Sequence, residues 1–125
     1  MIDPMRVTMA SLMTLLLAAS ARADGDAARG ETRFQECAAC HRLVAGANEV
    51  GPSLYGIFMR KAGELADFRY SPAMKRSGVT WTPETIDKYI ADPQAMIPAN
   101  RMPYAGMASA SDRADLIAYL QKAAK

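Results

Sequence analysis

The sequence has a single histidine, His41, and only two cysteines, Cys37 and Cys40, among its 125 residues. One histidine excludes metal sites built from several imidazoles, and two cysteines cannot form a disulfide-dense scaffold. Neither sign of charge dominates, because 15 Lys and Arg oppose 13 Asp and Glu and leave a formal net charge of +2. A nucleic-acid-binding protein would show a clear basic excess, so this class is disfavoured. The length allows one domain.

Residues 1–23 have the pattern of a secretory signal peptide. Arg6 supplies the positive start, residues 7–19 are mostly apolar, and Ala-Arg-Ala at 21–23 is a small-x-small cleavage pattern. The apolar stretch is too short for a membrane span, which needs about 20 residues. We therefore expect cleavage after the tripeptide, a mature domain at 24–125 and a location in the oxidising periplasm. An uncleaved amphipathic anchor is the alternative.

The mature chain has the signals of helices joined by long loops, and no stretch alternates as a strand would, so the expected class is all-α. Asp26 is a candidate N-cap for a helix reaching about Cys40. Thr82, with proline and glutamate after it, predicts a helix start, and Pro93 requires that helix to stop near residue 92.

Two glycine- and proline-rich stretches, 51–63 and 93–106, predict turns and no long regular element. A last helix is expected to begin after Ser109 or Ser111, with Asp112 in its first turn. Its apolar stripe consists of Leu116, Ile117 and Leu120.

The informative motif is Cys37-Ala-Ala-Cys40-His41, which is typical of a c-type haem attachment site. Residues three and four apart share a helix face, so both sulfurs can reach the vinyl groups of one porphyrin. His41 then lies on the same side, where its imidazole can take the fifth iron position.

Three other interpretations of the motif compete with haem attachment. A redox-active dithiol would need a βαβ context, which is missing. A structural zinc site lacks ligands, because the only three Cys and His residues form one short run. A local disulfide leaves the adjacent histidine unexplained.

A six-coordinate iron needs a second ligand, and without another histidine the candidates are Met, Lys or Tyr. Met102 stands out by context, since Pro98 and Pro103 make its segment stiff and neither helical nor strand-like. Ligation by His and Met raises the reduction potential. The methionines of the mature chain are Met59, Met74, Met96, Met102 and Met107.

Over residues 25–124 the chain resembles class I c-type cytochromes, the family of mitochondrial cytochrome c and soluble α-proteobacterial carriers. Besides the haem motif and Met102, the resemblance rests on Gly30, Phe34, the run at 51–56, Arg60-Lys61, Tyr70, Gly78-Val79-Thr80-Trp81, Tyr89, Pro93, Ile97-Pro98 and the run at 115–120. It implies the cytochrome c fold, with helices and long loops around one haem c held covalently by Cys37 and Cys40.

The resemblance also implies roles for further residues. Gly30 is expected where the first and last helices cross. The Pro52 carbonyl is expected to accept a hydrogen bond from the His41 ring. Leu54 is expected to contact the haem, and Tyr89 to lie near the Met102 sulfur.

The haem propionates are expected to meet Arg60, Tyr70 and Trp81 by hydrogen bonding or charge. Asn100 stands in an Ala-Asn pair that replaces Gly-Thr of the family, and it is expected to hydrogen-bond a propionate. Met74 replaces an asparagine of a buried water network.

Two further departures concern the backbone and the surface. Met59 replaces a family glycine. Of the positions that carry lysine around the haem edge of mitochondrial relatives, only Arg101 keeps the charge here, so docking of the mitochondrial kind is not expected. Those positions are Thr32, Glu36, Gln94, Ala95, Arg101, Ala108 and Ser109.

The resulting hypothesis is a soluble periplasmic one-electron carrier with His41 and Met102 as axial ligands, and not an enzyme. Its expected donor is a membrane cytochrome complex or dehydrogenase, and its expected acceptor an oxidase or photosynthetic reaction centre, with only transient docking at the membrane and no nucleic-acid partner. One alternative is an electron-input subunit dedicated to a single enzyme. The other is a haem enzyme or gas-binding protein with an open iron site.

Overall fold

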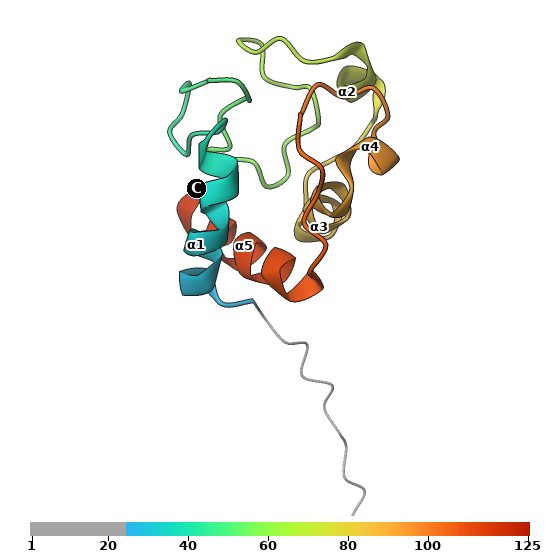
Figure 1. Ribbon diagram of the computed structural model, residues 1–125. Coiled ribbons are helices and arrows are strands. Elements are labelled where there is room, and N and C mark those ends of the chain that lie inside the picture. Colours follow the sequence, from blue (N-terminus) through green and yellow to red (C-terminus); the bar gives the residue numbers. More distant parts are fainter. Residues whose placement is uncertain (1–24) are drawn as a thin grey trace, which may run out of the picture.

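Residues 25–125 are described by a computed structural model, in which five helices are joined by long irregular segments (Figure 1). The expected signal peptide, residues 1–23, lies outside the described residues. Within the described part the one β contact is an isolated bridge between Lys61 and Thr80, so the all-α expectation is confirmed. The helices are α1 (Ala27–Ala38), α2 (Pro72–Arg76), α3 (Pro83–Ala91), α4 (Pro93–Met96) and α5 (Ala110–Ala123).

The three longer helices begin at the residues expected as caps. Asp26 accepts a hydrogen bond from the Arg29 amide at 2.8 Å and starts α1. Thr82 and Thr85 accept from each other's amides at 3.2 and 2.7 Å, which closes a capping box at the start of α3. Ser109, not Ser111, caps α5. These local hydrogen bonds satisfy amides that the first helical turn leaves without partners.

The two short helices lie in the proline-rich half of the chain. α4 is a single turn, which agrees with the expectation of no long regular element at 93–106. α2 has no counterpart among the expected helices, although Ser71 caps it and Pro72 is its first residue. A five-residue helix gives too short an apolar pattern to be recognised by periodicity.

The helices α1 and α5 cross (Figure 1), and Gly30 lies against the Asp115 backbone at the crossing. A Cβ atom at this position would overlap the Asp115 carbonyl oxygen, so only glycine permits the close approach. Beside the crossing, the rings of Phe34 and Tyr119 lie 5.5 Å apart, and Leu116 is 1% exposed. The crossing that the resemblance implies is therefore present, and it holds the end of α1 that carries the cysteines.

The helix α3 packs on α5 and is tied to it by Arg113, whose guanidinium donates to Asp87 at 2.8 Å. The same guanidinium donates to the carbonyl oxygens of Met107 and Ala108, at 2.8 and 3.0 Å. These bonds fix the segment between α4 and α5 where it returns to the helices. No helix within residues 25–125 has both the length and the apolarity needed to cross a bilayer.

Candidate functional site

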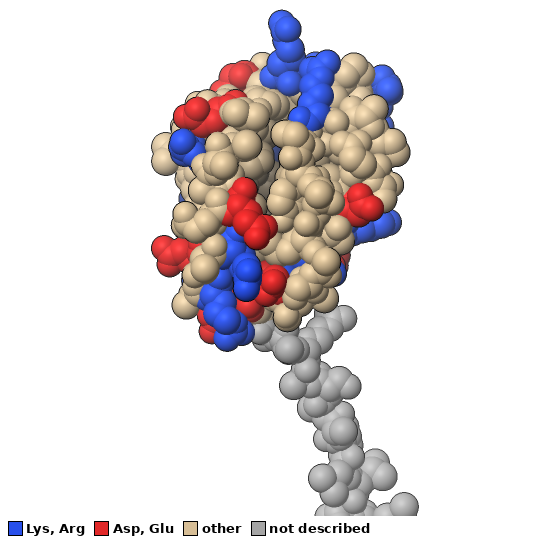
Figure 2. Space-filling view, in the orientation of Figure 1, with Lys and Arg blue, Asp and Glu red and all other residues tan. Residues whose placement is uncertain are grey.

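A cavity of about 290 Å³ lies between the end of α1 and the segment that carries Met102. Its mouth is the cleft in the face shown in Figure 2. Ten of the eleven residues expected to bind the cofactor line it, although they come from distant parts of the chain. They are Cys37, Cys40, His41, Pro52, Leu54, Arg60, Tyr70, Trp81, Tyr89 and Met102.

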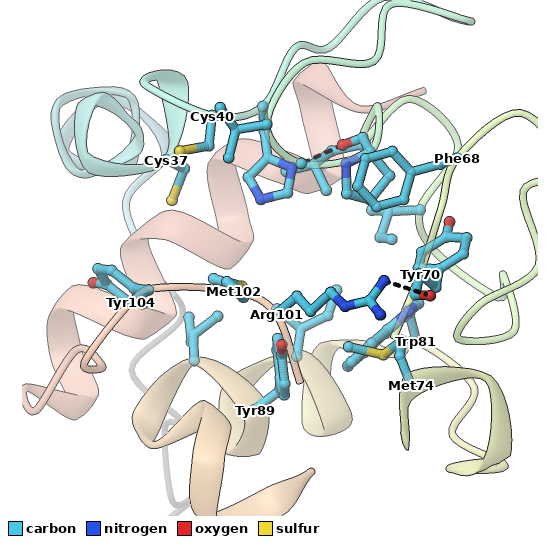
Figure 3. A pocket seen from close by; sticks show the side chains of 18 of the residues that line it. Cys37, Cys40, Phe68, Tyr70, Met74, Trp81, Tyr89, Arg101, Met102 and Tyr104 are labelled. Atoms are coloured by element: carbon cyan, nitrogen blue, oxygen red, sulfur yellow. Dashed lines mark hydrogen bonds between the residues drawn. The ribbon is translucent and has the colours of Figure 1, made fainter. Parts of the chain in front are cut away.

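The two cysteines reach the cavity from the last turn of α1 and the residues after it (Figure 3). The His41 amide donates to the Cys37 carbonyl at 2.9 Å, so the motif still follows a helical path there. Both thiols are half-buried and form no disulfide with each other. Burial, aided by the Glu36 charge, raises the pKa of the Cys37 thiol to about 11. A redox-active dithiol needs a lowered pKa, so this interpretation of the motif is disfavoured.

His41 is held by one ring nitrogen and presents the other. Its Nδ1 lies 2.7 Å from the Pro52 carbonyl oxygen, and because a carbonyl can only accept, Nδ1 carries the proton. The Nε2 lone pair is then free for a metal. Burial lowers the pKa of His41, which favours the neutral, ligating form, and the Pro52 hydrogen bond partly opposes this shift. A Cβ on Gly51 would lie 2.7 Å from Nδ1, so glycine there makes room for the ring.

Met102 lies across the cavity from the cysteines (Figure 3). Its backbone amide donates to the Asn100 side-chain oxygen at 2.8 Å. The Asn100 amide nitrogen donates to the carbonyl oxygens of Pro93 and Ile97, at 3.0 and 2.9 Å. Asn100 thus fastens the Met102 segment to α4.

Asn100 is the one expected binding residue that the structure does not bring to the cavity wall. Its side chain is buried and its polar atoms are used by the backbone of its own loop. The expected hydrogen bond from Asn100 to a propionate therefore finds no support in its position, and its observed role is to position Met102.

The far wall of the cavity combines aromatic rings with one buried cation. Arg60 is 8% exposed, and its guanidinium donates to the carbonyl oxygens of Ser53, at 2.8 Å, and of Tyr55. The rings of Trp81 and Tyr89 lie 5.0 Å apart in a tilted arrangement. A buried guanidinium at the wall favours a ligand with negative charge nearby.

The Tyr89 hydroxyl is buried and has no hydrogen-bond partner among the described residues. Its burial raises the pKa to about 12, so the hydroxyl keeps its proton at neutral pH. Leaving such a group unpaired costs about 1–3 kcal/mol, which indicates a site built around a further group.

The described residues contain no cluster of three or more His, Cys, Asp or Glu, so a structural zinc site is disfavoured.

The donors facing this cavity fit a haem. Two adjacent thiols, a free imidazole nitrogen and a thioether surround an apolar space, as covalent haem c with two axial ligands requires. The bonds that stabilise this arrangement come from the protein itself, through Pro52 behind His41 and Asn100 behind Met102.

Several residues of the cavity were not among the expected binding residues. Tyr104 donates a hydrogen bond from its hydroxyl to the Glu36 carboxylate at 2.7 Å, and both side chains line the cavity. Burial, and then the Glu36 carboxylate, raise the pKa of Tyr104 above its usual value. Arg101 donates to the Tyr70 carbonyl at 3.3 Å. The signal for Tyr104 in the sequence is its closeness to Met102, and Arg101 was indicated only as the one charge kept around the haem edge.

A helical chain that encloses an apolar cavity between a Cys-x-x-Cys-His segment and a methionine defines a small single-haem cytochrome. The family model described as "Cytochrome c" matches residues 27–124. The chain belongs to the cytochrome c family.

Its relatives and a solved structure agree with this membership. The chain is 50% identical over 88 residues to cytochrome c2 iso-2 of Magnetospirillum fulvum, covering 70% of this chain and 92% of the relative. It is 43% identical over 119 residues to cytochrome c2 of Blastochloris viridis, covering 94% of each. The structure of cytochrome cH from Methylobacterium extorquens is similar with a TM-score of 0.74 and 41% identity, covering 78% of this chain and 99% of that one.

Family membership gives the site its chemistry. Haem c is attached covalently through Cys37 and Cys40, and the chain is a one-electron carrier between redox complexes.

Proposed function

We propose that this chain is an exported, periplasmic electron carrier in which His41 and Met102 are the two axial ligands of the iron. The proposed ligation rests on one observation: His41 and Met102 lie on opposite walls of the cavity, and each is held by its own hydrogen bond. Pro52 holds the His41 ring from behind at 2.7 Å, and Asn100 holds the Met102 backbone at 2.8 Å. Donors held this firmly change position little with charge, which favours rapid electron transfer.

The bound haem c supplies an iron that accepts and releases one electron. The chain surrounds it with apolar side chains, among them Leu54, Trp81 and Leu116, which exclude water from the cavity. A dry, apolar site disfavours the more charged oxidised state, so it raises the reduction potential. Arg60 would offset the charge of the haem propionates with its buried guanidinium, and Tyr70 and Trp81 would serve as hydrogen-bond donors to them.

This arrangement favours a carrier over an enzyme or a gas-binding protein. A catalytic haem needs one open side with a group that acts on its ligand, and peroxidase-type sites use a second His or an Arg there. The sequence has no second histidine, the guanidinium of Arg101 donates to the Tyr70 carbonyl, and Met102 occupies the wall opposite the haem motif.

The test is the spectrum of Met102→Ala holoprotein. We expect loss of the methionine-to-iron charge-transfer band in the ferric state and carbon monoxide binding in the ferrous state at concentrations that leave the wild type unchanged. Met96→Ala is the matched control, because Met96 lies at the end of α4 and does not line the cavity. A band that persists in Met102→Ala would show that another residue ligates the iron.

The proposed partners are membrane redox complexes that contact the cavity mouth largely without charge. Within residues 94–111, the stretch 101–104 lines the cavity, and Arg101 is the one charged residue of the whole range. Salt screens interactions between exposed charges over about 8–10 Å at physiological ionic strength. Binding through a face with little charge should therefore depend little on salt. We expect electron transfer to a purified membrane partner to change less than about threefold between low and high salt. A steep decline would contradict this, and Gln94→Lys should introduce one with an acidic partner.

A further inference from the structure

The segment 97–107, which carries Met102, is held by hydrogen bonds on two sides of the cavity, and Arg101 also donates to the Tyr70 carbonyl at 3.3 Å. On one side it is bonded to α3 and α4, through Asn100 and through the Met107 amide, which donates to the Ile90 carbonyl at 2.7 Å. On the other side, Tyr104 donates to Glu36 at 2.7 Å, across 68 residues of sequence. Among the described residues, this is the one hydrogen bond that joins the segment to α1.

The position of this bond links the two walls of the cavity. Glu36 immediately precedes Cys37 on α1, and Tyr104 follows Met102 by two residues. Figure 3 shows Tyr104 at the end of the cavity nearest Cys37, on the same stretch of chain as Met102. If Met102 is to leave the cavity, the segment has to move away from α1, and the Tyr104–Glu36 bond has to break.

We propose that Tyr104 and Glu36 are a positioning pair that acts as a latch and holds Met102 in the closed arrangement. The inference rests on the proposed ligation by Met102. The bond has a charged acceptor and a phenol donor, which places it among the stronger protein hydrogen bonds, although the exposure of Glu36 weakens it. By the family resemblance, mitochondrial relatives carry lysine at the position of Glu36, and a lysine side chain cannot accept this hydrogen bond.

The latch affects the equilibrium between the closed and open positions of the segment 97–107, and it supplies no ligand to the iron. Asn100 and the contacts to α3 stay in place whether or not the segment is closed, because they lie on its own side of the cavity. Tyr104 and Glu36 stabilise only the closed state. Loss of the hydroxyl should therefore raise the fraction of molecules in which Met102 has moved away, by about five- to tenfold.

The experiment titrates ferric holoprotein with imidazole, which replaces Met102 only in molecules that have opened. Tyr104→Phe keeps the ring and removes the hydroxyl, and we expect it to bind imidazole about five- to tenfold more tightly than wild type. Glu36→Ala should give the same increase, and the double variant no further one. Glu36→Gln keeps an accepting oxygen, so it should reverse at least half of the increase in imidazole affinity that Glu36→Ala shows. Tyr55→Phe is the control, because Tyr55 is 44% exposed and does not line the cavity.

A bond that contributes only to overall folding would lower the denaturant midpoint and leave imidazole affinity unchanged. Affinities of Tyr104→Phe and Glu36→Ala within twofold of wild type would overturn the latch. Absence of the methionine-to-iron band from the wild type would instead overturn ligation by Met102. In that case, hydrogen exchange of the amides at 97–107 tests the latch separately, with faster exchange in Tyr104→Phe expected and equal exchange refuting it.

Discussion

Replacement of Gly30 by alanine tests the helix crossing on which the haem site is built. A Cβ added to Gly30 would overlap the Asp115 carbonyl oxygen, lie 2.5 Å from the carbonyl carbon of Asp115 and 2.8 Å from the Tyr119 Cβ. Carbon atoms prefer about 3.5–4.0 Å, so α1 and α5 would have to separate by about 1 Å. All three atoms belong to the backbone or are a Cβ of α5, so no change of rotamer can move them away.

Two effects of opposite sign determine the outcome. Alanine is a better helix former than glycine by about 1 kcal/mol, which would stabilise the variant. Overpacking against a rigid neighbour costs about 1–3 kcal/mol. A gap of 0.5–1 Å also forfeits roughly a quarter to a half of the contact energy of the side chains beside it, here Phe34 and Leu116. Their full burial is worth about 1.5–3 kcal/mol each, so this loss adds about 1–3 kcal/mol. The net expectation is destabilisation by about 1–5 kcal/mol, with a central value of about 3 kcal/mol.

The assay is thermal and urea unfolding of the holoprotein. The central loss of about 3 kcal/mol lowers Tm by about 12–24 °C, since 1 kcal/mol corresponds to roughly 4–8 °C in a domain of this length. Gly46→Ala is the control, because Gly46 has a φ of +73° and no heavy atom within 4 Å of an added Cβ. It should cost only the backbone penalty of about 1 kcal/mol. A Gly30→Ala variant as stable as wild type, or more stable, would refute the reasoning.

The structure supports two further predictions on stability. Met59 and Ala99 adopt φ values of +70° and +65°, which cost about 1–2 kcal/mol for a residue with a side chain. Met59→Gly and Ala99→Gly should each stabilise by about 0.5–1 kcal/mol after the higher entropy of an unfolded glycine is subtracted, and a lower urea midpoint in either would contradict this. Asp115 is buried at the crossing, where the hydrogen bond from Arg29 and then that from the Asp26 amide lower the pKa of its carboxyl. A lowered folded-state pKa gives stability that is complete above the unfolded pKa of about 3.9 and is lost as pH falls through the folded value. Asp115→Asn should therefore lose stability less steeply than wild type between about pH 5 and pH 3, and parallel urea midpoints would contradict the assignment.

Much of the fold follows from local patterns. The caps at Asp26, Thr82 and Ser109 act within three residues of themselves, so each helix start could be recognised from adjacent side chains. The short helix α2 could not, because its five residues give too short an apolar pattern to be recognised, although Ser71 caps it.

The expectation for Asn100 shows where local reasoning ends. Its neighbour Met102 made a role at the haem plausible, and the residue type is able to hydrogen-bond a propionate. Which acceptor an amide finds depends on the path of the folded loop, and here the side-chain amide of Asn100 donates to the Pro93 and Ile97 carbonyls.

The amino-acid sequence by itself determined the haem motif, because Cys37, Cys40 and His41 share one helix face by their spacing alone. It also indicated Met102, because the prolines around it are a local property of the chain. Only the tertiary structure decided that Gly30 must be glycine, that Asn100 serves the backbone, and that Tyr104 meets Glu36. These contacts join residues brought together by packing, and no sequence spacing encodes a distance between elements that approach each other only in the folded state.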